Sequence, residues 1–197
     1  MNAEFIYRPI SGKYPEKHFG NITPNSLWIK FVDKDEQVWV GSFEQSWVEQ
    51  GTFILNLIKK RKAFIVVGGQ TFLIDINKRE QLNKTEISDT KTAIIDEQEE
   101  NIYYSSGFDL RYMDINGNDF VLFDKYYFDD IKLIEIKNKK LYATYWNYQT
   151  SNKPFHFEID LITKELKDSF YNSENLTYSY ENPNPTFFTK LKKWITK

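Results

Sequence analysis

The chain has 197 residues, which is long enough for one domain with a substantial core. Aromatic residues make up 17% of it, a share that suits half-buried β-sheet faces, and the absence of cysteine excludes disulfides, thiolate nucleophiles and thiolate metal sites. A formal net charge of -2, from 26 basic and 28 acidic residues, provides no overall field for holding nucleic acid.

The N-terminal residues show no targeting segment. Met1 to Pro9 lack a charged stretch followed by an apolar run, and no later stretch approaches the ~18 apolar residues of a membrane span. We therefore expect a cytoplasmic protein and no membrane insertion. Lysine, asparagine and isoleucine are abundant, as in AT-rich bacterial genomes, so we also expect a bacterial origin.

The first β-rich part of the chain is a partial unit within residues 26–50. It comprises an apolar run from Leu27 to Val32, a polar turn, and a second run from Val38 to Phe43. The stretch from Ser42 to Ile58 has apolar residues at helical spacing, which allows a turn or two of helix, but Gly51 interrupts the pattern and the run Phe53-Ile54-Leu55 favours a strand after it.

Three fuller units follow, at about 52–90, 92–129 and 131–170. In each of them a charged tetrapeptide separates two apolar runs, which indicates a hairpin turn. These tetrapeptides begin about 40 residues apart, and they are Lys59–Lys62, Glu97–Glu100 and Lys137–Lys140.

An aspartate after an apolar run is a second marker with the same spacing. It recurs about every 40 residues and stands before a polar turn, at Asp33, Asp75, Asp114 and Asp160. Together the two markers predict a unit of strand, charged turn, strand, loop, strand, Asp turn and strand. In the last unit Phe155, Phe157 and Ile159 alternate with polar residues, as in a strand with one buried face.

This unit resembles the four-stranded meander of a β-propeller blade. The resemblance implies a mainly β fold of antiparallel four-stranded meander repeats. Four units allow either a small closed propeller or an open meander folded into a sandwich. The Trp-Asp and Gly-His pairs of one propeller class are absent, so no particular family is indicated.

The C-terminal part of the chain differs from the repeats. We expect one β domain over residues 1–180, a proline-containing linker over 181–186, and a short amphipathic helix with a basic face over 187–197. We expect this helix to pack on the β domain, and the alternative is an anionic membrane surface.

Motifs for catalysis or metal binding are missing. The two histidines, His18 and His156, have no metal-ligand spacing, and the segment from Asp114 to Asp119 fits a hairpin turn at Asn116-Gly117 better than a calcium loop. Gly68-Gly69 indicates a turn rather than a phosphate loop. We therefore expect no cofactor, no metal and no enzymatic activity.

Aromatic residues beside carboxylates favour a protein-binding module, most concretely an immunity protein that occludes the active cleft of a bacterial toxin. Carboxylates would meet a basic cleft, and aromatic side chains would be the buried anchors. The candidate residues are Glu97, Glu99, Glu100, Asp129, Asp130, Tyr145, Trp146 and Tyr148. The alternative is a ligand- or glycan-binding β domain with an aromatic platform, with a glycosidase as its remote extension.

Overall fold

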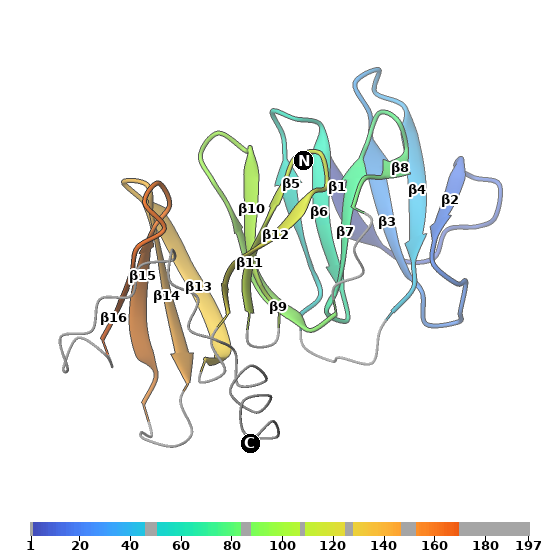
Figure 1. The fold of residues 1–197 in the computed structure, drawn as a ribbon. Helices are drawn as coiled ribbons and strands as arrows, with labels where there is room; N and C mark the ends of the chain where they lie inside the picture. The colour runs from blue at the N-terminus through green and yellow to red at the C-terminus, as the bar shows by residue number, and fades with distance from the viewer. Residues whose placement is uncertain are drawn as a thin grey trace, which may run out of the picture.

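A computed structural model shows an all-β arrangement in the part of the chain that it describes. The described residues are 2–45, 51–83, 88–106, 109–124, 128–146 and 153–169. Their strands form four separate four-stranded sheets, which we number 1 to 4 in chain order (Figure 1). This confirms the predicted mainly β fold of four-stranded repeats.

Sheets 2, 3 and 4 are antiparallel meanders whose strands follow one another in chain order. Sheet 2 holds β5 (Phe53–Leu57), β6 (Lys62–Val67), β7 (Gln70–Asp75) and β8 (Glu80–Gln81). Sheet 3 holds β9 (Thr90–Ile95), β10 (Asn101–Ser106), β11 (Asp109–Asp114) and β12 (Asp119–Asp124). Sheet 4 holds β13 (Asp129–Lys137), β14 (Lys140–Trp146), β15 (Phe155–Asp160) and β16 (Leu166–Asp168). The predicted units and their hairpin turns are therefore correct.

Sheet 1 departs from the simple repeat. It consists of β1 (Ala3–Ile6), β2 (Glu16–Phe19), β3 (Leu27–Val32) and β4 (Val38–Phe43) in the spatial order β1-β3-β4-β2. The edge strand β2 runs parallel to β4, whereas β1 and β3 pair antiparallel. The sequence predicted only β3 and β4, because β1 and β2 are four residues each and most of β2 is exposed, so neither shows a clear apolar alternation.

At residues 42–45 and 51–58 the structure has no helix, and the strand predicted from Phe53 is confirmed. β4 continues as strand to Phe43, and β5 begins at Phe53. Residues 46–50 lie outside the description, as do the predicted linker at 181–186 and the predicted helix at 187–197. Among the described residues no helix is long and apolar enough to cross a membrane.

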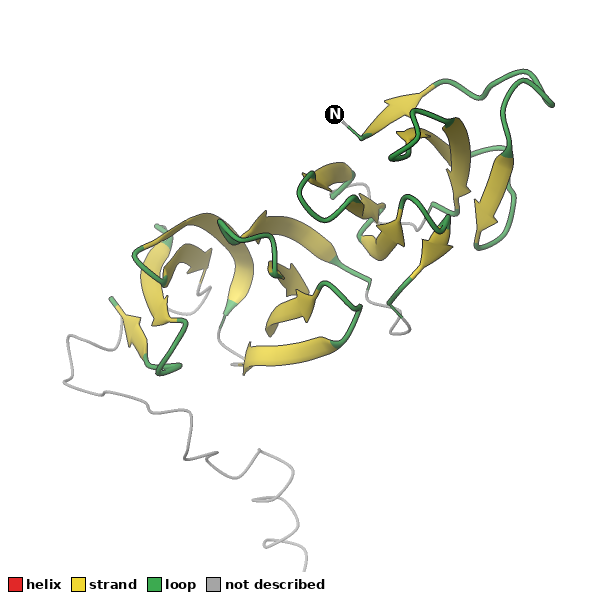
Figure 2. Cartoon of the chain, turned by 90° about the horizontal axis from the view of Figure 1, so that it is seen from above, coloured by secondary structure: helices red, strands yellow, loops and turns green. Residues whose placement is uncertain are grey.

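The four sheets stand in a row, and their first strands are neighbours. β1 contacts β5, β5 contacts β9, and β9 contacts β13. Figures 1 and 2, which are views at right angles, both place sheet 1 and sheet 4 at opposite ends of the row. The described strands thus form an open array of propeller-like blades and not a closed ring.

The core fills the three junctions between successive sheets. One cluster of buried side chains lies between sheets 1 and 2, one between sheets 2 and 3, and one between sheets 3 and 4. β6 shows why some strands are apolar without alternation: Ala63 and Ile65 face the first cluster, while Phe64 and Val66 face the second. A strand covered on both faces reads as a continuous apolar run.

The recurring aspartates close the turns that end the third strand of each unit. Each uses a side-chain oxygen to accept two backbone N–H groups of its own turn, at 2.8 to 3.1 Å. This is the local geometry of an Asx turn, which Asp and Asn favour. The aspartates are Asp33, Asp75, Asp114 and Asp160, so their repetition has a structural cause.

Candidate functional site

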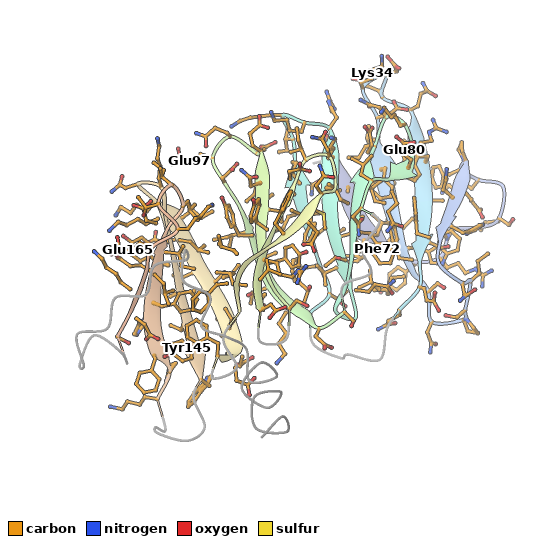
Figure 3. The ribbon with its side chains drawn as sticks, in the orientation of Figure 1. Lys34, Phe72, Glu80, Glu97, Tyr145 and Glu165 are labelled. Atoms are coloured by element: carbon orange, nitrogen blue, oxygen red, sulfur yellow. The ribbon has the colours of Figure 1, made fainter. Side chains whose placement is uncertain are left out.

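The end of the sheets that carries the charged hairpin turns and the Asp turns is called the turn end below. In Figure 3, Lys34, Glu80 and Glu97 lie along this upper edge, above Phe72 and Tyr145. Because the turns of neighbouring sheets meet there, the contacts between turns decide which surfaces remain open to a ligand or a partner.

Direct polar contacts link sheets 1 and 2 at the turn end. The Arg79 guanidinium lies 3.4 Å from the Asp33 carboxylate, and the backbone N–H of Lys34 donates to the side-chain oxygen of Asn77 at 3.0 Å. This junction is therefore closed at its turn end.

The junction between sheets 2 and 3 is closed in a similar way. The basic turn of sheet 2 meets the acidic turn of sheet 3: the N–H of Lys59 donates to Glu99 at 2.8 Å, and Lys60 forms an ion pair with Glu100. Gly117, in the Asp turn of sheet 3, lies so close to the backbone of sheet 2 that a Cβ atom there would be 2.6 Å from the carbonyl carbon of Leu82.

Between sheets 3 and 4, the hydrogen bonds and the ion pair of the described residues lie at the other end instead. Lys91 lies 3.3 Å from Asp130, and the Thr92 hydroxyl donates to the Ile131 carbonyl and accepts from the N–H of Leu133, both at 3.3 Å. At its turn end this junction holds a pocket of about 470 Å³. The pocket is lined by Asp96, Glu97, Gln98, Tyr103, Ile136, Asn138, Lys139, Leu161 and Ile162.

Tyr103 and aliphatic side chains form the apolar part of the pocket. Tyr103 on β10 is 5% exposed, and Ile136 and Leu161 pack against the same cluster of buried side chains. Ile162, in the Asp turn of sheet 4, is 67% exposed although it is fully apolar. Because Ile162 lies beside the apolar walls of the pocket, it extends the apolar surface that a ligand or partner would meet.

The charged groups of the pocket differ in how far they are already satisfied. The Asp96 carboxylate accepts the backbone N–H groups of Glu100 and Asn101 at 2.8 and 3.1 Å. Within the described ranges, neither the Glu97 carboxylate nor the Lys139 ammonium group has a hydrogen-bond or ion-pair partner. Glu97 belongs to sheet 3 and Lys139 to sheet 4. The pocket therefore has, among the described residues, an unpaired negative group on one side and an unpaired positive group on the other.

The environment of Tyr103 disfavours ionisation of its hydroxyl group. Burial, followed by the nearby Asp96 carboxylate, raises the pKa of Tyr103 to about 12. The ring centroid of Tyr103 is 6.0 Å from that of Tyr112, and Tyr112 stacks on Phe120 at 4.9 Å. A row of three rings therefore leads from the pocket across sheet 3.

A second polar cluster, on the other face of sheet 3, has a structural role. Tyr104 is fully buried and its hydroxyl donates to Asp119, whose carboxylate also accepts from the Arg111 guanidinium at 3.1 Å. Burial raises the pKa of Tyr104 above its usual value. Because these groups satisfy one another between sheets 2 and 3, they are not free for a ligand.

The five carboxylates predicted to face a partner do not form one surface. Glu97 lines the pocket, whereas Glu99 and Glu100 contact sheet 2. Asp129 and Asp130 begin β13 and lie at the opposite end of the sheets, where Asp130 also pairs with Lys91. The sequence could not separate them, because the direction of each side chain depends on which turn it meets.

The predicted aromatic anchors are also separated. Tyr145 is fully buried, stacks on Phe128 at 3.9 Å and donates to Asp168 at 2.8 Å, so it belongs to the core and has no surface to offer a partner. Trp146, the next residue, is half-buried on the face of sheet 4 that points away from sheet 3. Tyr148 lies outside the described residues.

The pocket residues missed by the sequence prediction come from three turns and two strands, β10 and β13. Ile136, Lys139, Leu161 and Ile162 belong to sheet 4, and they line one pocket with residues of sheet 3 only because the two sheets pack together. One signal was present: the hairpin turns alternate in charge from basic to acidic to basic. The acidic turn of sheet 3 could pair with the basic turn of sheet 2 or with that of sheet 4. In the structure it pairs with the turn of sheet 2.

Among the described residues, the histidines do not lie in a metal site. His18 uses Nδ1 to contact the Ser42 hydroxyl at 2.7 Å and packs edge-on against Trp28. In the part of the chain that the structure describes, no group of three or more His, Asp or Glu side chains is arranged to hold a metal ion.

Comparisons with known proteins give only distant likenesses in structure. No family model matches the chain, and no curated protein matches it. A chain in the S. cerevisiae complex of a Dbp5 variant bound to Nup159, a Gle1 variant, IP6 and ADP is 10% identical with a TM-score of 0.46, covering 76% of this chain and 44% of that one. The Myceliophteria thermophila Cps50 (Swd1) β-propeller domain is 10% identical with a TM-score of 0.43, covering 69% and 51%. The chain thus spans about half the length of the solved structures it matches.

Proposed function

We propose that this protein is a non-catalytic protein-binding module, and that its partner docks on the turn end of the junction between sheets 3 and 4. One observation carries the proposal: turn contacts close the other two junctions at this end, whereas this junction holds a pocket of about 470 Å³ with Ile162 exposed beside it.

The composition of the pocket fits a protein interface. Such interfaces have an apolar, water-excluding centre and a polar rim. Here Tyr103, Ile136 and Leu161 supply the apolar centre, while the charged side chains of Glu97 and Lys139 lie exposed around it. The energy of binding would come from the buried apolar contact, and the charges would select the partner.

Site-specific cross-linking in the native host tests this proposal. A photoreactive phenylalanine analogue replaces Ile162 in one variant, and Tyr7 in a control, which is 98% exposed on the loop between β1 and β2 of sheet 1. We expect one protein to cross-link at position 162 and not at position 7. The same protein should fail to cross-link when Leu161→Asp is added, because a carboxylate in the pocket opposes burial of an apolar partner group.

Two results would contradict the proposal. One is the absence of any cross-linked protein at position 162 in cells that express the chain at its native level. The other is a cross-linked protein that appears equally at positions 162 and 7, since that pattern reports general stickiness rather than a binding site.

A narrower form of the proposal is an immunity protein that blocks the active cleft of a bacterial toxin. Its support is the exposed, unpaired Glu97 beside an apolar pocket, which suits a basic cleft. Co-expression with the toxin-like product of an adjacent gene tests it. Protection that is lost in Ile162→Asp would support the immunity role, and undiminished toxicity with the wild-type chain would exclude it.

The pocket volume favours a second candidate, a small ligand such as a glycan. Ligand sites commonly measure about 300–1,000 Å³ and combine apolar walls with a few polar groups. Binding on a glycan array that is lost in Tyr103→Ala would support this function. No binding across a broad panel, together with a cross-linked protein at position 162, would leave protein binding as the function.

A further inference from the structure

The lining of the pocket between sheets 3 and 4 has more negative than positive groups. Asp96 and Glu97 lie on the side of sheet 3, and Lys139 lies on the side of sheet 4. Ile136 and Leu161 supply aliphatic walls between them. The pocket therefore has an acidic side, an aliphatic middle and one cation opposite.

Glu97 is the carboxylate that remains available in this pocket. Asp96 already accepts two backbone N–H groups. Lys59 of sheet 2 donates to the backbone carbonyl of Glu97 at 2.6 Å and does not contact its carboxylate. A cation from another molecule would therefore find an acceptor at Glu97 without displacing an internal bond.

The row of rings beside the pocket already binds one cation of the chain itself. The Lys164 ammonium group lies 5.3 Å from the ring centroid of Tyr112, and burial lowers the pKa of Lys164. Tyr112 neighbours Tyr103, which lines the pocket. An aromatic face within about 6 Å of a cation stabilises it, most strongly where water is excluded. Tyr103 is only 5% exposed but lines the pocket, so it borders the space that a cation from outside would enter.

Resting on the proposed function, we propose that the pocket receives one basic side chain, an arginine or a lysine, from the partner protein. The methylene groups of such a side chain pack on Ile136 and Leu161, while its charged head lies near Glu97 and Tyr103. Lys139 repels the head from the other side of the pocket, which fixes the direction in which the side chain enters.

Two small probes of nearly the same shape, one cationic and one neutral, test this inference. N-acetyl-L-arginine amide is cationic, and N-acetyl-L-citrulline amide has nearly the same shape without the charge. Each is titrated into the full ¹⁵N-labelled chain, and amide shifts are followed by NMR. We expect the arginine probe to bind about three-fold more tightly, as a solvent-accessible ion pair allows, with shifts concentrated at residues 96–98, 138–139 and 161–162.

Charge variants of the chain give the matched controls. Glu97→Gln should weaken binding of the arginine probe about two- to five-fold, and Lys139→Gln should strengthen it by a similar factor. Glu36→Gln removes an exposed carboxylate from a turn of sheet 1, remote from the pocket, and should change nothing. None of these side chains has an ion-pair partner in the described residues, so the fold should tolerate all three changes.

The inference is overturned if the citrulline probe binds as tightly as the arginine probe, if neither probe shifts the pocket amides, or if Glu97→Gln leaves binding unchanged. Cross-linking at position 162 separates this failure from that of the proposed function. A partner that still cross-links there while the probes show no charge preference leaves the docking site intact and excludes a basic side chain as its ligand.

Discussion

The aspartates that close the turns also make the stability of the fold depend on pH. The N–H groups of Thr163 and Ile162 hold the pKa of Asp160 below its ordinary value of 3.8. A carboxyl group whose pKa is lower in the folded chain than in the unfolded chain stabilises the fold above its unfolded pKa. This contribution is lost as the pH falls through the folded pKa.

We therefore expect the free energy of unfolding to fall below about pH 4, and Asp160→Asn to remove part of that fall. The asparagine variant should be less stable than wild type at pH 7, and the difference should shrink toward about pH 2. Urea unfolding at a series of pH values measures this. Glu36→Gln, which removes a carboxylate that closes no turn, is the control, and a constant difference for Asp160→Asn would contradict the argument.

Tyr145 offers a second prediction at the scale of single residues. Its hydroxyl donates to Asp168, which is only 4% exposed. Tyr145→Phe removes a donor from a buried carboxylate, so we expect a loss of about 1–3 kcal/mol in the free energy of unfolding, measured with urea. Tyr142→Phe, on the half-buried outer face of the same strand, should change stability little. Equal effects of the two variants would argue against the buried role of Tyr145.

Single residues were predictable from the sequence where the cause is local. Asp75 and Asp114 close turns within a few residues of themselves, so their pattern predicted their structure. Tyr145 and Trp146 carried no such signal, because both faces of β14 hold aromatic side chains. Whether Tyr145 or Trp146 points toward sheet 3 depends on how the two sheets pack.

At the scale of secondary structure elements, close contact between sheets 2 and 3 requires a glycine at position 117. Gly117 has a φ of +86°, and a Cβ there would lie 2.6 Å from the carbonyl carbon of Leu82. Gly12 has a φ of +79° but no atom within 4 Å of the same position. Comparing substitutions at Gly12 and Gly117 therefore separates the cost of backbone strain from the cost of steric crowding.

We expect Gly12→Ala to cost about 1–2 kcal/mol from its positive φ alone, and Gly117→Ala to cost about 1–3 kcal/mol more. Thermal or urea unfolding of the two variants gives the comparison. Similar losses for both would mean that sheets 2 and 3 are not in close contact at this turn.

The repeat predicted most elements because its markers are local. Hairpin turns, Asp turns and apolar runs defined sheets 2 to 4, whereas β1 depends on a long-range partner. The Asn56 side chain of β5 accepts from the N–H of Ala3 at 2.8 Å and donates to its carbonyl at 3.1 Å. No sequence pattern within residues 1–19 predicts that contact.

At the scale of the whole molecule, the core clusters join neighbouring sheets into one unit. Phe64 of sheet 2 packs against Tyr104 of sheet 3 with ring centroids 5.5 Å apart, and both side chains are fully buried. We expect the chain to unfold in one transition, with equal calorimetric and van't Hoff enthalpies. Phe64→Ala should lower the stability by about 3–5 kcal/mol and keep a single transition. Two separate transitions, with only one shifted by the variant, would show that the sheets unfold independently.

The pocket depends on how whole sheets pack against one another, which explains why the sequence did not predict it. Each unit could be recognised alone, but the pocket exists because the acidic turn of sheet 3 contacts the basic turn of sheet 2 and leaves the turn of sheet 4 without that contact. Glu97 was predicted to bind a partner, yet its setting depends on how three sheets pack.

Hydrogen exchange tests the central claim, that the partner docks at this pocket, most directly. The full chain is measured alone and in complex with the protein recovered by cross-linking. The account predicts slower exchange at residues 96–103, 136–139 and 161–164 in the complex, and no change in the loop at residues 7–15. Protection of that loop, with the three turns around the pocket unchanged, would contradict it.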